Sequence, residues 1–543
     1  MVALFLLSVV AIVLAVDVVV GSVYTFLDDA PTAPGLAGVP REVYLAGAGV
    51  TLILIAVVSL WNIIALAGGG AKVARMLGAR KVASDTRDPL ERRFLNIVEE
   101  MAIASGVRVP EAWIMDKEKG INAFAAGWTV SGAVVAVTRG TLERLTRDEL
   151  QGVVGHEFSH ILNGDMGLNI RMIGVLAGIV VIGSISTFVI RMGAESDDIR
   201  GAVPLFLIGA ALFLIGYIGL FFARLIKSAV SRQREFLADA SSVQFTRNPD
   251  GIAGALDQIR ATTSGALIQG RYAEETSHLF FGQAIKVHLG GLFDTHPPLE
   301  ERIRRVNPRF APSSYRPKRV TTDEASAATP AAADVTDVGA AGRRVADLGI
   351  AWGHSPQQSA TLVGTLKPEK LSYAQRLLGE IPAPLRESLR TADGAAAAIV
   401  ALLLAPKDEV MQEQLQAMKA AGLDDAAQRA ASVAFQIRRL GLAFHLPLVD
   451  LALPPLKSAA EEAKKQLIAA LEAVINADRR VSLHEFIVLT FVREQLWRKP
   501  KPPRADRRIA DLKPQAGTLL ALMAHAGTRA GAHSRSERYF EAS

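Results

Sequence analysis

Four long apolar runs dominate the hydrophobic pattern of the chain. They cover about residues 2–27, 43–67, 173–190 and 203–222. A helix needs about 20 apolar residues to cross the hydrocarbon core of a bilayer, so each run predicts a transmembrane helix. The first run lacks a basic leader and continues past the usual length of a signal peptide, which favours an uncleaved anchor.

The segments that connect these runs alternate in charge. The first and third connections, DDAPTAPGLAGVPREVY and MGAESDDIRG, are acidic. Basic residues follow the second run (Lys72, Arg75, Arg80, Lys81, Arg87, Arg92 and Arg93) and the fourth (Arg224, Lys227, Arg232 and Arg234). Because basic loops stay on the cytoplasmic side, we expect a bacterial inner-membrane protein with both termini and residues 70–167 in the cytoplasm.

Asp17 is a carboxylate deep inside the first apolar run. An acid within a membrane span is a functional candidate by default. The alternative is a protonated side chain that faces the helix bundle or a water-filled cavity, and the sequence leaves both readings open.

Composition adds two restrictions. The 543 residues are 50% hydrophobic and 21% charged, so substantial water-exposed parts must accompany the membrane helices, and two or more folded units are expected. The chain has no cysteine, so any metal must be held by His, Asp or Glu. The net charge of +6 is mild and fits Lys and Arg beside membrane spans, so we expect no nucleic-acid partner.

The stretch TRDELQGVVGHEFSHIL, residues 146–162, reads as one helix. Thr146 followed by Glu149 forms a capping box at its start, and Asn163-Gly164 supplies a stop at its end. His156 and His160 lie one turn apart, so both imidazoles can reach one ion. Glu157 lies beside them and can take a proton from a water that the ion activates, as in H-E-x-x-H zinc hydrolases. The alternative is a chance pair of histidines.

A third ligand is expected beyond the third and fourth apolar runs. In SRQREFLADASSVQFTRNP, Glu235 and Asp239 are four residues apart and share one helix face. Two membrane crossings return the chain to the side that it left, so Glu235 can meet His156 and His160. Asp239 would then orient an imidazole. A solvated charge pattern among basic residues is the alternative.

These motifs, with GINAFAAG (120–127), AVVAVTRGTLERLTRDELQGVVGHEFSHILNGD (133–165) and THPPLEERI (295–303), resemble the HtpX-like membrane zinc metallopeptidases, relatives of the CAAX prenyl protease. The resemblance covers about residues 1–310. It implies endoproteolysis of membrane or misfolded proteins at the cytoplasmic membrane face. It also implies one Zn²⁺ per chain, with Glu235 as third ligand and Glu157 as catalytic base.

The fold class that follows is mainly α. We expect four transmembrane helices, a cytoplasmic zincin-like (gluzincin) α+β catalytic domain with a small β-sheet, and a C-terminal helical bundle. AVVAVT is a β-branched run suited to a strand at the rim of the cleft, where an extended peptide could pair with a free edge.

Other candidate site residues lie around these motifs. Asn122, with Ala123 and Phe124, could grip the substrate backbone, or Asn122 could simply form a turn. His296 could donate a hydrogen bond to the oxyanion or cap the loop before Pro297-Pro298. Arg302 could pair with an active-site acid or lie at the surface, and for Asp165 we favour holding the turn after the metal helix.

The amino-acid composition of the chain changes after Phe310, where the resemblance ends. Residues 311–342 are rich in Ala, Thr and Pro and predict a flexible linker. Apolar spacing in LSYAQRLLGEIPAPLRESLR and AAEEAKKQLIAALEAVIN predicts a soluble helical bundle. AVINADRRVSLHEF weakly resembles TerB-like helical domains. Asp478 and Glu485 could bind a cation, but a helix-turn-helix capped by Ser482 and Glu485 is favoured, with His484 at the surface.

The predicted organisation has seven parts. They are two transmembrane helices (1–69), the first catalytic part with the HExxH helix (70–167), a transmembrane hairpin (168–228), the second catalytic part (229–310), a flexible linker (311–367), a helical domain (368–498) and a basic, loosely ordered tail (499–543).

Two other functions compete with a protease. The first is a membrane-anchored scaffold or binding protein with a structural or vestigial metal site; a structural zinc would more often have four protein ligands, and the sequence offers no fourth. The second is a transporter, which the nearly nonpolar spans disfavour. The expected partners are protein or peptide substrates, the lipid bilayer and proteins that bind the C-terminal helical domain.

Overall fold

The structure is a computed structural model that describes residues 2–27, 35–195, 199–270, 272–285, 296–315, 368–477, 482–497 and 517. It divides into two compact units, Met1–Ala383 and Pro384–Ser543. Nearly all of the predicted linker (311–367) and of the predicted tail (499–543) lies outside the described residues, and so does Asp478.

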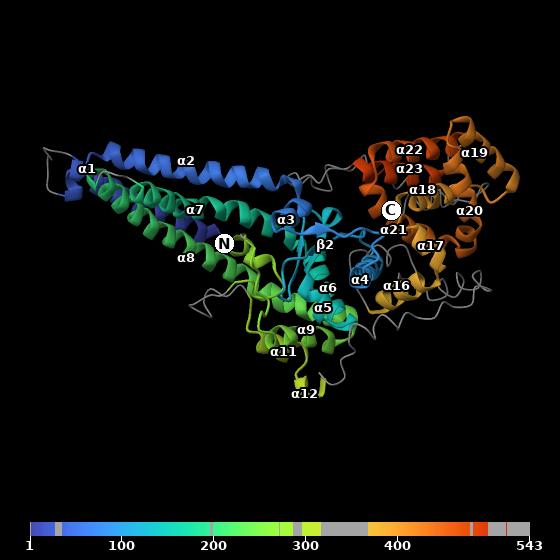
Figure 1. The fold of residues 1–543 in the computed structure, drawn as a ribbon, viewed down its shortest axis with the longest axis horizontal. Helices are drawn as coiled ribbons and strands as arrows, with labels where there is room; N and C mark the ends of the chain where they lie inside the picture. Colours follow the sequence, from blue (N-terminus) through green and yellow to red (C-terminus); the bar gives the residue numbers. More distant parts are fainter. Residues whose placement is uncertain are drawn as a thin grey trace. The chain divides into compact units, whose positions relative to one another are not determined.

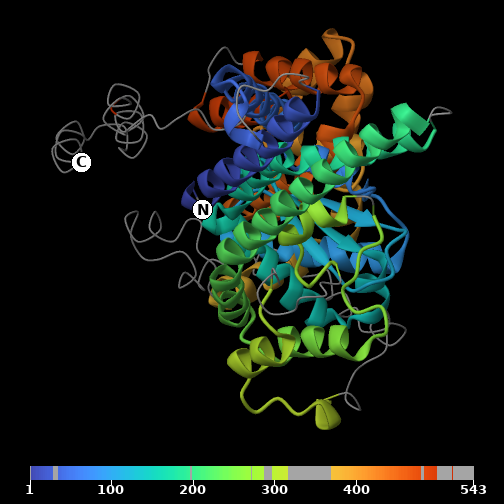
Figure 2. The same ribbon diagram turned by 90° about the vertical axis from the view of Figure 1, so that its left-hand side faces the viewer.

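Among the described residues of the first unit, four helices are long and apolar enough to cross a membrane, as the sequence predicts: α1 (Val2–Leu27), α2 (Arg41–Ala65), α7 (Asp165–Ala194) and α8 (Ile199–Thr246). α7 packs against α8 and α2, and α1 packs against α2 and α8 (Figures 1 and 2). The backbones of α7 and α8 are in direct contact at Gly183 and Gly216. A Cβ added at Gly216 would lie 2.4 Å from the Cα of Gly183, so a larger residue would not fit there. Such small residues let membrane helices approach closely.

Two of these helices are longer than their apolar runs. α7 begins at Asp165, directly after the predicted metal helix. α8 continues from its apolar part, which ends at Ser228, to Thr246, and this continuation carries Glu235 and Asp239. The membrane helices therefore extend without a break into the region of the predicted site.

A four-stranded sheet contains β1 (Arg80–Lys81), β2 (Glu111–Met115), β3 (Ala123–Ala126) and β4 (Val134–Thr138), in the order β1-β2-β4-β3. β2 and β4 are parallel and the other pairs antiparallel. The prediction that AVVAVT forms a strand is confirmed, but its placement at a free edge is wrong. All five residues of β4 are buried, as expected for a strand covered on both faces, and the edge strands are β1 and β3.

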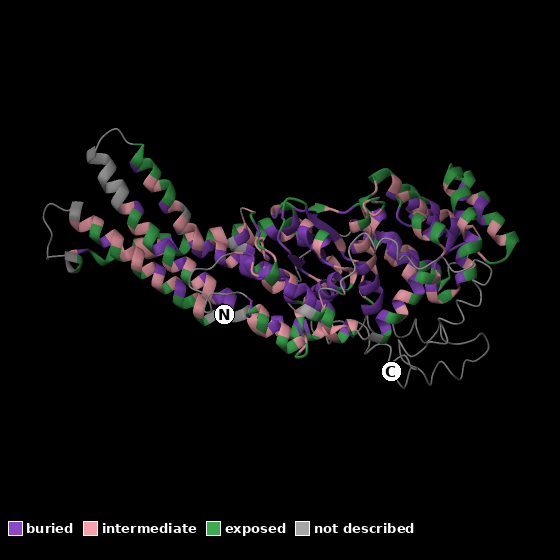
Figure 3. Cartoon of the chain, turned by 60° about the horizontal axis from the view of Figure 1, so that its bottom comes forward, coloured by how far each residue is buried: buried purple, intermediate pink, exposed green. Residues whose placement is uncertain are grey.

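Further helices of this unit include α3 (Gly70–Met76), α4 (Pro89–Ser105), α5 (Arg139–Arg144), α6 (Arg147–Asn163), α9 (Pro249–Ala261), α10 (Ala273–Thr276), α11 (Leu299–Val306) and α12 (Pro312–Tyr315). Helices α3, α4, α5, α6 and α7 pack against the sheet, the remaining short helices of this unit lie further out, and buried residues gather between sheet and helices (Figure 3). α6, the predicted metal helix, packs against α8, α9, α4 and β3.

α16 (Pro368–Glu380) belongs to the first unit, although the sequence assigns it to the C-terminal helical domain. It packs against α4, where Gln375 donates a 3.1 Å hydrogen bond to Glu100, and Glu369 pairs with Arg247. The boundary between the units follows Ala383 rather than residue 367.

The second unit is all helical in its described part. It contains α17 (Ala383–Ser388), α18 (Ala392–Ala401), α19 (Asp408–Ala420), α20 (Asp424–Leu440), α21 (His445–Ser458), α22 (Glu461–Asn476) and α23 (Leu483–Trp497). The predicted cap of the last helix is confirmed: the Ser482 amide donates to Glu485 at 2.7 Å, and the Glu485 amide donates to the Ser482 hydroxyl at 3.2 Å.

Candidate metal centre

The helix that carries the HExxH sequence begins and ends where the sequence predicts. The Thr146 amide donates to Glu149 Oε2 at 2.8 Å and the Glu149 amide donates to Thr146 Oγ1 at 3.3 Å, which completes the capping box. Gly164 closes the helix in the left-handed conformation, with φ of 73°. The capping groups therefore set the ends of the helix that holds both histidines.

Glycine allows the neighbouring helices to approach α6 closely. A Cβ added at Gly152 would lie 2.7 Å from the backbone nitrogen of Ile252 on α9. On the α8 side, Ser242 donates a 2.6 Å hydrogen bond to the Gly152 carbonyl. This contact lies two helical turns from Glu235 and brings the part of α8 that follows Ser228 against α6.

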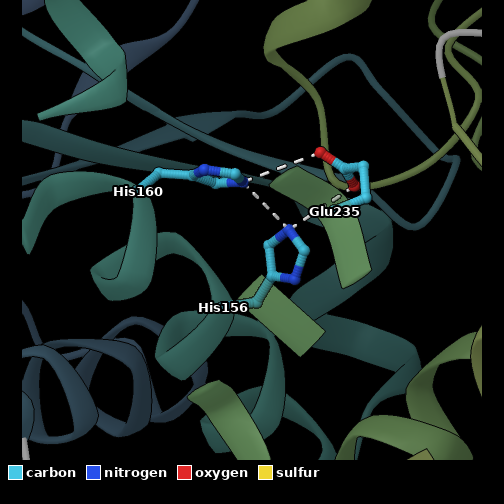
Figure 4. Close-up of side chains that lie close together, drawn as sticks. All are labelled: His156, His160 and Glu235. Atoms are coloured by element: carbon cyan, nitrogen blue, oxygen red, sulfur yellow. Dashed lines mark hydrogen bonds and ion pairs between the residues drawn. The ribbon is translucent and has the colours of Figure 1, made fainter. Parts of the chain in front are cut away.

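The three predicted ligands converge (Figure 4). One donor atom from each of His156, His160 and Glu235 lies within 4.8 Å of the others. His156 Nε2 lies 3.2 Å from His160 Nε2 and 3.6 Å from Glu235 Oε2, and His160 Nε2 lies 3.7 Å from Glu235 Oε1. Two imidazoles and a carboxylate, with no thiolate, are a donor set that suits zinc.

The orientation of the two imidazoles fits a metal ion. Nδ1 of His156 donates to Asp239 at 2.9 Å, and Nδ1 of His160 donates to Asp165 at 3.0 Å. Each carboxylate holds its ring in the tautomer whose Nε2 carries a lone pair, and the two Nε2 atoms point at one spot beside Glu235. Carboxylate–histidine pairs of this kind orient metal ligands in zinc sites.

The surrounding charges favour an ionised Glu235. Burial alone would raise its pKa, but the charge and hydrogen bond of His296 and the charges of His156 and Arg302 outweigh burial and lower the pKa to about 2. Burial likewise opposes ionisation of Asp239, yet the bidentate contact with Arg302 and the hydrogen bond from His156 hold its pKa well below the usual range. Both carboxylates are therefore anionic at neutral pH.

Glu157 differs from these two acids. Both of its carboxylate oxygens are buried and have no hydrogen-bond partner among the described residues. Burial raises its pKa to about 8; the nearby charge of His160 works against this rise and that of Glu235 adds to it. The Ala125 amide of edge strand β3 points toward the carboxylate and lowers its pKa slightly. Glu157 can thus exchange a proton near neutral pH.

His296 and Arg302 reach the same centre from the segment that precedes α11 and from α11 itself. His296 Nδ1 lies 2.8 Å from Glu235 Oε2, while its buried Nε2 has no partner in the described part of the chain. Arg302 is fully buried and donates two 2.7 Å hydrogen bonds to Asp239 and one of 2.7 Å to the Phe281 carbonyl. Arg302 thus pairs with an acid of the site rather than lying at the surface.

Asn122, Ala123 and Phe124 do not offer free groups to a substrate, which corrects the sequence-based expectation. The Asn122 side chain donates to the carbonyls of Ala266 and Gly282 and accepts from the amides of Ala123 and Gly282. The Ala123 carbonyl accepts from the Phe281 amide at 2.8 Å, and Phe124 is fully buried against Phe280. The reason is that residues 280–282 pair with this end of β3.

The sequence analysis did not predict the contacts of three residues at the site. Arg234 donates a 2.6 Å hydrogen bond to Asp165, the amide of Ala125 faces Glu157, and the Phe281 ring packs edge-on against the His156 ring at 4.9 Å. Successive residues of a strand point in opposite directions, so the sequence of β3 could have indicated that Ala125 and Phe124 face different neighbours. No other sequence pattern indicated these three contacts. Nothing in the sequence pairs Arg234 with Asp165.

The fold and this site define a multi-pass membrane metallopeptidase. The model of peptidase family M48 matches residues 90–309. Curated relatives named Protease HtpX homolog are 37% identical over 231 residues in Dictyoglomus thermophilum (41% of this chain, 72% of the relative) and 39% identical over 224 residues in Thermoanaerobacter pseudethanolicus (39% and 70%). One from Streptococcus pyogenes serotype M28 is 35% identical over 218 residues (39% and 72%). No solved structure matches.

The chain belongs to the HtpX-like family of M48 peptidases and is a zinc metalloendopeptidase. The family match ends at residue 309, so it does not extend to the C-terminal unit, and the resemblance of residues 473–486 to TerB-like domains stays a prediction.

Proposed function

We propose that this protein cleaves membrane or misfolded proteins at the cytoplasmic face of a bacterial inner membrane, with His156, His160 and Glu235 as zinc ligands and Glu157 as general base. The observation that carries the proposal is the pairing of three converging donor atoms with a buried carboxylate whose oxygens are both unpartnered. A carboxylate left without partners in a protein interior is costly, and a reacting water gives it one.

Glu157 moves the proton in this mechanism. A zinc ion held by the three ligands would act as a Lewis acid that polarises the scissile carbonyl and acidifies water. Glu157 accepts the proton from the attacking water and delivers it to the leaving amine. Burial raises the pKa of Glu157 above its usual range, which favours uptake of the proton from the water.

His296 and Ala125 are proposed to position the substrate. The free Nε2 of His296 can donate to the oxygen that gains charge on the scissile carbonyl, while its Nδ1 stays on Glu235. The Ala125 amide is the part of edge strand β3 that faces Glu157, so an extended peptide that pairs with β3 there would run past the general base. Residues 280–282 close the other end of this edge.

Two observations support a site at the cytoplasmic membrane surface. Asp165, the partner of His160, is the first residue of membrane helix α7, and Glu235 lies on the continuation of membrane helix α8. The site is thus within a few residues of the spans, where a protein that leaves the bilayer would first be met. The basic residues that flank these spans favour the cytoplasmic side.

The test compares wild-type protein with Glu157→Gln, both purified in detergent with a chelator and then reloaded with zinc. We expect equal zinc content and a loss of casein cleavage of about 100-fold or more, the usual contribution of a general base. Cleavage by the variant at the wild-type rate would assign the base to another residue, and loss of zinc would make Glu157 a ligand.

A further inference from the structure

Asp17 is the one acidic residue within the four apolar runs, and the metal centre does not use it. By helical rise it lies about 22 Å from Val2 and about 15 Å from Leu27, the two ends of α1. Lys and Arg can extend from a span toward the membrane surface, but an aspartate side chain is too short to do so. Asp17 therefore needs a partner inside the bilayer.

The carboxylate of Asp17 lies where α1 meets α2. A Cβ added at Gly47 of α2 would lie 2.8 Å from Asp17 Oδ1, so glycine makes room for the acid. Oδ1 is buried in this contact and has no hydrogen-bond partner among the described residues. The side chain as a whole is only half-buried and Oδ2 is not enclosed, so this second oxygen faces outward from the pair of helices.

The described spans supply no partner for this carboxylate. Thr51, one turn beyond Gly47 on α2, donates its hydroxyl hydrogen to the Gly47 carbonyl at 2.8 Å. The serine and threonine hydroxyls of α1 all donate to carbonyls of the same helix (Ser8, Ser22 and Thr25). None of the four apolar runs contains Lys or Arg. Asp17 thus makes no hydrogen bond or ion pair with the described residues.

Asp17 shares one face of α1 with apolar side chains that the other described spans leave open. Leu7, Val10 and Leu14 precede it at intervals of three and four residues, the spacing of one helix face, and are 54%, 53% and 61% exposed. Ile12, on another face, is fully buried against the other spans. Exposed apolar side chains suit lipid, but an acid among them does not. This face therefore fits a membrane helix that brings a polar partner.

The acid also selects the charge of that partner. Basic side chains inside a membrane pair with acidic ones, because an unpaired charge in hydrocarbon is costly. A second copy of this chain cannot supply the cation, since its apolar runs contain no Lys or Arg and its own α1 would bring acid against acid. The complementary partner is a different protein whose membrane helix carries a basic side chain.

We propose that Asp17 and the exposed face of α1 bind a transmembrane segment of another protein that carries Lys or Arg near the middle of the bilayer. The proposal rests on the proposed function, because a membrane protein that has lost its own acidic partner exposes such a side chain and is a substrate of the proposed kind. α1 packs against α8, whose continuation carries Glu235, so a segment held by α1 lies beside the bundle that leads to the metal centre.

The test measures binding without cleavage, in the full-length Glu157→Gln protein in lipid nanodiscs. Because the chain has no cysteine, Leu14→Cys places a single thiol one turn from Asp17. The probe is a Leu/Ala transmembrane peptide of about 21 residues with one central Lys and one Cys a turn away, and the matched peptide has Leu in place of Lys. After addition of an oxidant, we expect the Lys peptide to form about fivefold more disulfide-linked complex, the effect of one polar contact between membrane helices.

Asp17→Asn and Asp17→Leu, each added to the Leu14→Cys protein, should remove this preference. Leu214→Cys is the matched control, because it places a thiol at a similarly exposed position of the α8 span, away from Asp17, and should show no preference.

Equal crosslinking of the two peptides to the Leu14→Cys protein would overturn the proposal, and this comparison does not depend on how the Asp17 variants fold. A preference for Lys that persists in Asp17→Leu would also overturn it. Crosslinking between two protein copies that excludes the peptide would make a second copy the occupant, against the proposal. A preference for Lys in a protein whose Glu157 form cleaves no casein would contradict the proposed function and leave the Asp17 site standing.

Discussion

Arg234 on α8 donates a 2.6 Å hydrogen bond to Asp165, the first residue of α7, and the same carboxylate accepts from His160 at 3.0 Å. This contact joins the two ends of the membrane hairpin through Asp165, the hydrogen-bond partner of the predicted metal ligand His160. The position of the His160 ring therefore depends on how α7 and α8 lie against each other.

Arg234→Gln should loosen this connection. The charged donor is lost, so Asp165 holds the His160 ring less firmly, and we expect zinc affinity to fall by about 10-fold, as for other changes beside metal ligands. Competition with a chelator of known affinity measures it. Arg493→Gln, in the C-terminal unit, is the control. Unchanged zinc affinity in Arg234→Gln would show that the position of the His160 ring does not depend on this contact.

Asp239→Asn should weaken metal binding and the fold together. Asp239 accepts from His156 at 2.9 Å and twice from Arg302, which is fully buried. We expect a loss of zinc affinity of about 10- to 100-fold and, because the buried guanidinium loses its counter-ion, destabilisation of about 3–5 kcal/mol. Chelator competition and thermal unfolding measure the two effects. Asp250→Asn, whose carboxylate contacts Asn307 at an exposed site, should change neither.

Asn122→Ala separates a structural role from a substrate-binding role. The side chain makes four hydrogen bonds that tie β3 to the carbonyl of Ala266 and to Gly282. Each buried group left without a partner costs about 1–3 kcal/mol, so the melting temperature should drop markedly. A raised KM with an unchanged melting temperature would instead restore Asn122 as a substrate contact.

His278 should make the fold sensitive to acid. It lies in the short helix η4 (Ser277–Leu279), and burial, helped by the charge of Lys227, lowers its pKa from 6.5 to about 3 despite a hydrogen bond to the Asn169 carbonyl. The unfolded chain takes up a proton below pH 6.5 while the folded protein does not, so stability falls as the pH drops toward 3. Between pH 6.5 and 5.0 the loss is about 2 kcal/mol.

The check compares thermal unfolding at pH 7.5 and 5.0 for the Glu157→Gln protein with and without His278→Asn. Other histidines, those of the metal centre included, titrate in both proteins, so the difference between the two pH dependences isolates His278. The variant should be less stable at pH 7.5 and show the flatter dependence. Identical dependences would mean that His278 is protonated in the folded protein.

Local patterns predicted a large part of the architecture. The four spans, the capped helix from Thr146 to Gly164 and the cap at Ser482 follow from composition and from contacts within a few residues. The meeting of Glu235 with His156 and His160 followed from spacing along two helices and from the even number of crossings between them. Such inferences need no knowledge of packing.

The sequence-based predictions were wrong where tertiary packing determines the neighbours of a segment. The run AVVAVT was read as an edge strand, but whether a strand lies at the edge depends on its neighbours in space, and β4 lies between β2 and β3. Asn122 was read as a substrate contact, but the segment around Gly282, 160 residues away, takes up its hydrogen bonds. The assignment of α16 failed for the same reason, because its apolar face packs on α4.

By itself, the sequence determined which residues are apolar enough to enter a membrane and which donor atoms share a helix face, because both depend on neighbours along the chain. Only the tertiary structure decided the partners of those donor atoms. Asp239 contacts the predicted ligand His156 from 83 residues away, His296 contacts Glu235 from 61 residues away and Arg302 contacts Asp239 from 63 residues away, whereas Asp165 lies five residues from His160. Glu235 and Glu157 are both buried, and the tertiary structure distinguishes them by their partners: His296, His156 and Arg302 lower the pKa of Glu235, whereas burial raises that of Glu157.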